Sequence, residues 1–166
     1  MSNNDTSQAQ ELILWRIADK RHPILSGTGA SLYGGRWNSP GYEVIYAATS
    51  YSLCILEQLA HISKASMPTS QVWVKIKILP SVRYEEANHQ KIQGWNNDDL
   101  IASRDFGDQW IEERRTAVLL IPSIFSPPGQ SNEKNAILNP HHPDFRDIQV
   151  TPPEPVVWDK RLFQSH

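Results

Sequence analysis

The stretch Gly34-Gly35-Arg36-Trp37-Asn38 places an arginine beside two glycines, and the apolar run Val44-Ile45-Tyr46-Ala47-Ala48 follows it closely. Glu57 comes next, in a segment with a helical pattern. Three separate segments can therefore bring a guanidinium, a phenol and a carboxylate to one cleft. This set suits an anionic ligand that contains a sugar, because the planar fork of arginine matches phosphate oxygens.

Length and charge narrow the class of protein. The 166 residues are 39% hydrophobic, which is enough for one domain with its own core. The formal charge is −2, so the chain offers no general attraction to a nucleic-acid backbone. We predict a soluble, cytoplasmic protein without direct nucleic-acid or membrane partners, because no apolar run approaches membrane-spanning length and no secretion signal is present.

Cysteine and histidine usage argues against disulfides and metal sites. Cys54 is the only cysteine, so it forms no internal disulfide and fits a reducing compartment. The adjacent pair His141 and His142 points apart on an extended backbone, and no Cys cluster accompanies it. We therefore expect no metal and no resident cofactor.

The pattern of apolar residues predicts short strands with grouped helices. Residues 20–41 are rich in Gly, Ser and Pro and indicate a long, ligand-facing loop. A helix is expected from a cap at Thr49 or Ser50 to about residue 62, and a short one over 108–115. Strands are expected at residues 13–18, 44–48, 72–78, 117–121 and, as an edge strand, 151–158. This order predicts a single α+β domain with a mostly antiparallel, split sheet core flanked by helices.

Several blocks in this order resemble the RES-domain family, which is named for an Arg, a Glu and a Ser. The resemblance is carried by Arg16 on the first strand, Glu57 and Ser123. Gly35-Arg36-Trp37-Asn38, Tyr46 and residues 133–145 also match, and the resemblance spans about residues 14–158. It divides the chain into a disordered tail over 1–10, a RES domain over 11–160 and a second tail over 161–166.

The resemblance implies a function that composition does not reveal. RES proteins are toxins of bacterial toxin–antitoxin pairs, with a fold related to ADP-ribosyltransferases, and they consume NAD. The implied partner is an antitoxin with an Xre-like DNA-binding part that blocks the active-site cleft, so a hetero-oligomer is expected. Any promoter binding would then come through that partner.

The chemistry of NAD cleavage assigns roles to these residues. Arg16 and Arg36 are candidates for the pyrophosphate, and Glu57 for stabilising the oxocarbenium-like ribose that forms as nicotinamide leaves. Tyr46 would border the nicotinamide ring. Glu57, Arg36 and Tyr46 are thus the expected catalytic residues, while Ser123 and Asn135 are expected to bind NAD, with turn capping as the alternative role for Asn135.

Other interpretations stay open at this point. Arg36 can instead form a surface ion pair with Glu43 or Asp19, and Tyr46 can be a core residue. For the protein as a whole, three functions remain. It is an NAD glycohydrolase or phosphorylase, a protein ADP-ribosyltransferase that uses NAD as donor, or a non-catalytic relative that only binds a partner. The product formed from NAD by the pure protein separates them.

Overall fold

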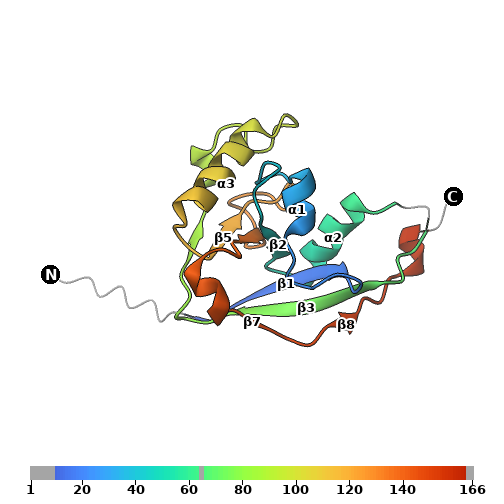
Figure 1. The fold of residues 1–166 in the computed structure, drawn as a ribbon. Helices are drawn as coiled ribbons and strands as arrows, with labels where there is room; N and C mark the ends of the chain where they lie inside the picture. Colours follow the sequence, from blue (N-terminus) through green and yellow to red (C-terminus); the bar gives the residue numbers. More distant parts are fainter. Residues whose placement is uncertain (1–9, 64–65, 164–166) are drawn as a thin grey trace.

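The computed structural model describes residues 10–63 and 66–163 and has one curled, mixed β-sheet with helices packed on it (Figure 1). The strand order is β4-β5-β6-β2-β1-β3-β7, with β8 also paired to β3. Among the strands of the described residues, β4 and β5 form the only parallel pair. The strands are β1 Leu12–Asp19, β2 Ile45–Ala48, β3 Gln71–Ile78, β4 Tyr84–Glu86, β5 Val118–Ile121, β6 Asn135–Leu138, β7 Gln149–Val150 and β8 Glu154–Pro155. The predicted α+β class with a mostly antiparallel sheet is confirmed.

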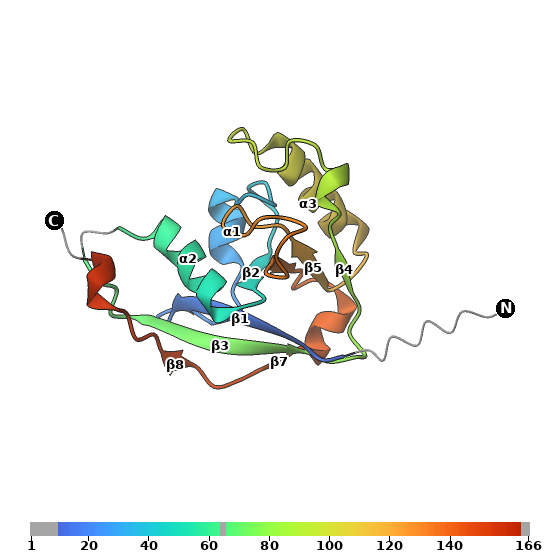
Figure 2. The same cartoon turned by 180° about the vertical axis from the view of Figure 1, so that it is seen from behind.

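The helices pack on this sheet at separate places. The α-helices are α1 Thr28–Tyr33, α2 Tyr51–His61 and α3 Ile101–Glu113, and the 3-10 helices are η1 His89–Lys91, η2 Pro143–Asp147 and η3 Lys160–Phe163. In Figure 2, α1 and α2 lie over the long β1–β3 ribbon, while α3 lies farther away, over the β4–β5 end. No helix of the described residues is long and apolar enough to cross a membrane.

The sheet is split at the junction of β1 and β2. Strands β1 and β3 pair along eight residues, whereas β1 and β2 share the single pair Trp15–Ala48. One face of each half contributes to a common core, in which Leu14 and Ile76 pack in the same cluster as Leu120 and Leu138. Burial of these side chains holds the two halves together and leaves the opposite face for the helices.

Helix α2 forms where its capping residue predicts it. The Oγ of Ser50 accepts a hydrogen bond from the backbone N–H of Leu53 at 3.1 Å, which satisfies one of the free donors of the first turn. Leu53 and Cys54 are buried against Ile17 and Ala48 of the sheet. Gln58 also donates from Nε2 to the Ile17 carbonyl at 3.1 Å. These contacts fix the rotation of α2 and therefore the direction of Glu57.

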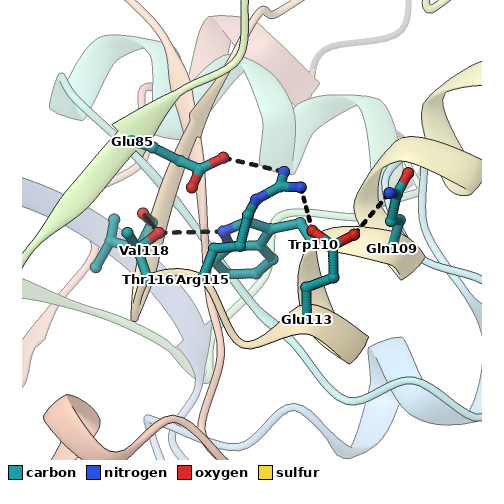
Figure 3. Close-up of polar contacts among 7 residues, drawn as sticks. All are labelled: Glu85, Gln109, Trp110, Glu113, Arg115, Thr116 and Val118. Atoms are coloured by element: carbon teal, nitrogen blue, oxygen red, sulfur yellow. Dashed lines mark hydrogen bonds and ion pairs between the residues drawn. The ribbon is translucent and has the colours of Figure 1, made fainter.

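Helix α3 is tied to the sheet by a polar network that Figure 3 shows. The buried Trp110 donates from Nε1 to Thr116 Oγ1 at 3.1 Å, and this hydroxyl donates to the Val118 carbonyl at 2.9 Å. Arg115 joins Glu85 on β4 to Glu113 at the end of α3. Gln109 also donates from Nε2 to Glu113 at 2.7 Å, and the hydrogen bonds from Gln109 and Arg115 lower the pKa of Glu113. The carboxyl end of α3 is thereby fixed beside β4 and β5.

The structure corrects several predicted elements. The segment 20–41, predicted to be a loop, contains helix α1. The carbonyl of Ala30 in this helix accepts a hydrogen bond from the buried Asn38 side chain at 2.8 Å. The helix predicted over 108–115 begins earlier, at Ile101. The edge strand predicted over 151–158 is reduced to β8, and its neighbours Pro152 and Pro153 lack the N–H that a sheet ladder needs.

The predicted tails fall mostly outside the described residues. Of the tail over 1–10, only Gln10 is described. Of the tail over 161–166, residues 161–163 belong to η3, where Phe163 packs edge-to-face on Trp158 at 5.7 Å between ring centroids.

Candidate active site

Glu57 is half-buried on α2 and is held by two side chains from the sheet. Its Oε1 accepts a hydrogen bond from Ser123 Oγ at 2.8 Å and another from Asn135 Nδ2. No other described residue hydrogen-bonds the carboxylate, so Oε2 is left for a ligand. The structure therefore brings together three of the site residues predicted from the sequence. Ser123 lies 66 residues and Asn135 lies 78 residues after Glu57 in the chain.

Ser123 and Asn135 reach Glu57 because two neighbouring strands end at the same place. Strand β5 ends at Ile121, two residues before Ser123, and Ile121 pairs with Asn135, the first residue of β6. Asn135 thus starts a strand, and the turn-capping role considered for it is wrong. Its Oδ1 is buried and has no hydrogen-bond partner among the described residues. A buried amide oxygen of this kind is an available acceptor beside Glu57.

Arg36 lies in a loop that is fixed by the hydroxyl of Tyr46. This hydroxyl donates to Asn38 Oδ1 at 2.8 Å and accepts from the Trp37 N–H at 3.1 Å. Burial raises the pKa of Tyr46 above its usual value, so the phenol stays neutral and can donate. Gly35 has no room for a side chain, because a Cβ there would lie 2.4 Å from the Tyr46 hydroxyl oxygen.

The guanidinium of Arg36 is only partly used by the protein. Nη1 donates to the carbonyls of Trp95 at 3.3 Å and Asn97 at 3.0 Å. Nε and Nη2 have no partner among the described residues. Glu43 contacts His141 and Asp19 contacts Arg21, so the alternative ion pair of Arg36 with Glu43 or Asp19 is wrong.

One face of α3 clamps this loop, a feature that the sequence analysis missed. Arg104 donates from Nε to the Gly35 carbonyl at 2.9 Å, and Asp108 accepts from the Ser39 N–H at 2.8 Å. Between them, Gly107 touches the backbone of Trp37 so closely that a Cβ would lie 1.7 Å from its carbonyl oxygen. The spacing of 104, 107 and 108 places all three on one helix face and was the available signal.

Arg16 is held by backbone carbonyls on three sides. It donates to Ile24 at 2.6 Å from Nε, to Tyr46 at 2.7 Å from Nη1 and to Ser26 at 3.1 Å from Nη2. Burial lowers the pKa of Arg16 to about 10, which leaves it charged at neutral pH. Three of its five N–H groups are thus engaged by backbone carbonyls.

The sheet register relates these groups to one another. Tyr46 and Ala48 lie on one face of β2, and Ala48 pairs with Asn135. Tyr46 and Asn135 are therefore diagonal neighbours, typically about 7–8 Å apart. Trp15 pairs with Ala48. The side chain of the next residue, Arg16, therefore leaves β1 on the opposite face of the sheet. Among the described residues, no hydrogen bond or ion pair joins Glu57 to Arg16 or Arg36.

A pocket of about 160 Å³ adjoins the Glu57 group, and we call it the loop pocket. It lies between the β5–β6 connection and the segment from β4 to η1. Ser123 lines it, whereas Glu57, Tyr46 and the two predicted arginines do not. The other lining residues used below are Glu86, His89, Ser126, Glu133 and Lys134.

No metal cluster accompanies this site. Among residues 10–63 and 66–163, no group of three or more His, Cys, Asp or Glu side chains is arranged to hold an ion. His142 instead caps η2 by accepting from the Asp144 N–H at 3.1 Å.

Fold and site define a small α+β domain in which a helix carboxylate meets a serine and an asparagine at two strand ends. The sequence pattern of the RES domain matches residues 13–159. The chain belongs to the RES-domain family of toxins, as the resemblance indicated.

Similar proteins agree with this assignment. The chain is 33% identical over 160 residues to the "Prs ADP-ribosylating toxin" of Sphingobium sp. (strain YBL2), covering 91% of this chain and 96% of that protein. It is 34% identical over 161 residues to "Toxin Res" of Yersinia enterocolitica, covering 91% and 99%. The fold resembles a chain in the crystal structure of the M. tuberculosis MbcT–MbcA toxin–antitoxin complex, with a TM-score of 0.67, 18% identity and coverage of 89% and 85%.

Proposed function

We propose that this RES-domain protein cleaves the bond between nicotinamide and ribose in NAD and acts as the toxin of a toxin–antitoxin pair. The observation that carries the proposal is the Glu57 carboxylate. One of its oxygens is fixed by Ser123 and Asn135, and the other has no hydrogen-bond partner among the residues that the structure describes. A fixed carboxylate is the group that an oxocarbenium-like ribose requires.

Glu57 supplies electrostatic stabilisation to the reacting sugar. The nicotinamide of NAD is already a cation, so it leaves with the bonding electrons and needs little proton donation. Positive charge then develops on the ribose, and Oε2 of Glu57 stabilises it. The buried Oδ1 of Asn135 accepts a ribose hydroxyl in the same place.

The arginines bind the pyrophosphate. Arg36 offers Nε and Nη2, and Arg104 brings a second guanidinium to the Gly34–Gly35 turn, where its Nε donates to the Gly35 carbonyl. Two guanidinium groups around one turn favour a doubly charged ligand. Tyr46 then keeps the turn in place, with its ring toward the Asn135 side, where it can border the nicotinamide.

A partner protein follows from this activity. An enzyme that consumes NAD injures its own cell unless it is held silent, so we infer an antitoxin, with an Xre-like DNA-binding part, that covers the cleft. The neighbour of similar fold was crystallised as a toxin–antitoxin complex, which supports this inference.

A second activity shares the same cleft. The Sphingobium relative is named for ADP-ribosylation of Prs, and at 33% identity this favours transfer of ADP-ribose to a protein as the alternative to water or phosphate as acceptor. Whether a protein, water or phosphate accepts the ADP-ribose, the bond between nicotinamide and ribose is cleaved with the help of Glu57.

The test is chromatography of the products formed from NAD by the purified chain, freed from any partner, with and without inorganic phosphate. Release of nicotinamide without an acceptor protein supports cleavage by water or phosphate. Glu57→Gln should lower the rate by about 10²-fold or more, while the exposed Glu11→Gln serves as the control. Intact NAD with the wild-type chain, or an unchanged rate in Glu57→Gln, contradicts the proposal.

A further inference from the structure

The loop pocket contains a buried hydroxyl that the protein itself does not satisfy. Ser126 is 4% exposed, and its Oγ has no hydrogen-bond partner among the described residues. Buried hydroxyl groups in proteins are normally hydrogen-bonded, so an orphan in a pocket wall indicates a group that enters from the pocket. A volume of about 160 Å³ holds several water molecules or one small alcohol.

Ser123 connects this pocket to the carboxylate. Its hydroxyl has one donor, which goes to Glu57, and two acceptor positions. One acceptor position takes the Phe125 N–H at 3.1 Å. The other remains open, and Ser123 lines the pocket. A group in the pocket can therefore donate to Ser123 while Ser123 donates to Glu57.

The charges around the pocket select against an anion. Glu86 and Glu133 contribute two carboxylates, and Lys134 contributes one ammonium group, which lies 3.3 Å from Glu86. His89 is the other titratable group among the lining residues. Inorganic phosphate would meet two carboxylates and an ammonium group that is already paired, whereas a neutral hydroxyl meets no such repulsion.

We propose that the loop pocket admits the nucleophile, that this nucleophile is a neutral hydroxyl group, and that Ser123 relays its proton to Glu57. The inference rests on the proposed cleavage of NAD. The ribose C1–nitrogen bond breaks and its electron pair leaves on nicotinamide, while the hydroxyl oxygen forms the new bond to C1. Its proton passes to Ser123 Oγ as the Ser123 proton passes to Glu57, which later releases it to water. Water and an alcohol group share this chemistry.

The test measures how NAD cleavage divides between acceptors. The full chain is incubated with NAD in buffer that contains methanol, and in a second arm inorganic phosphate, and the products are separated by chromatography. We expect ADP-ribose and its methyl glycoside, with little ADP-ribose 1-phosphate. Ser126→Val narrows the pocket and should lower the ratio of methyl glycoside to ADP-ribose, because methanol needs more room than water. The exposed Ser81→Val is the matched control and should keep the wild-type ratio.

A second variant covers the case in which Ser126→Val does not fold. Ser126→Ala keeps the volume and loses only the hydroxyl, and it should slow product formation about fivefold at saturating NAD with an unchanged melting temperature. A wild-type ratio in folded Ser126→Val, a wild-type rate in Ser126→Ala, or phosphate as the main acceptor overturns the pocket assignment while leaving NAD cleavage standing. Intact NAD with the wild-type chain removes the proposed function itself, and the pocket assignment with it.

Discussion

Gly107→Ala tests whether the position of the arginine loop depends on α3. An added Cβ would lie 1.7 Å from the Trp37 carbonyl oxygen, where a carbon and an oxygen normally stay about 3.3 Å apart. The helix or the loop must therefore move by about 1.6 Å. The obstacle is backbone rather than a flexible side chain, so we place the cost near the upper part of the usual range for overpacking, about 3 kcal/mol.

Helix propensity works in the opposite direction and sets the net effect. Alanine is favoured over glycine inside a helix by about 1 kcal/mol, which leaves a net loss of about 2 kcal/mol. For a domain of this size, that loss lowers the melting temperature by about 4–8 °C. The bonds of Arg104 and Asp108 to the loop lie on either side of Gly107. A shift of this size therefore also displaces Arg36, and misplacement by about 1 Å can cost about 10²-fold in rate.

The assay combines thermal denaturation with the rate of NAD loss. Gly29→Ala is the matched control, because Gly29 is exposed in α1 and a Cβ there meets no atom within 4 Å. It should leave the melting temperature unchanged or slightly higher. A Gly107→Ala protein as stable and active as the Gly29→Ala protein would refute the view that close packing of α3 fixes the loop.

Substitutions at three further residues test the other parts of the site. Asn135→Asp replaces the donor to Glu57 with a second carboxylate; the two like charges repel each other, so the rate of NAD cleavage should fall well below that of the control Gln149→Glu, which adds a carboxylate at an exposed position of β7. Arg36→Ala should raise KM for NAD with a smaller effect on kcat, and Arg36→Lys should recover only part of the binding; an unchanged KM in both would exclude a pyrophosphate role. Arg16→Met leaves three backbone carbonyls without their donor and should lower the free energy of unfolding by several kcal/mol in denaturant titrations; an unchanged free energy of unfolding would contradict a structural role for the guanidinium.

Local signals explain which elements could be predicted. The alternation of Val72, Val74, Ile76 and Ile78 with polar residues matches the alternating burial of β3, because strand side chains alternate between faces. Ser50 marks the start of α2 because a serine oxygen accepts from the first turn. Helix α1 escaped prediction because its stability depends on the side chain of Asn38, eight residues away from the carbonyl that it bonds.

The residues of the candidate site also fall into those that could be predicted from the sequence and those that could not. Residue type and the helical pattern pointed to Glu57, whereas the family resemblance supplied Ser123 and Asn135 and grouped the three. Arg104 and Asp108 were missed because a polar pair on a helix is ordinarily a solvated face. Their hydrogen bonds to the loop and the contact of Gly107 with the Trp37 backbone show that this face packs against the loop. The loop pocket was missed because its walls come from segments separated by more than 30 residues.

The amino-acid sequence alone determined the α+β class, most strand positions, the start of α2 and the types of chemical group available. These depend on periodicity, capping and side-chain chemistry, which act over a few residues. Tertiary structure decided that Ser123 and Asn135 meet at one oxygen of Glu57, that the Arg16 guanidinium is largely engaged by backbone, and that Arg104 accompanies Arg36. Such placements follow from strand register and from burial of one helix face, and these involve partners far apart along the chain.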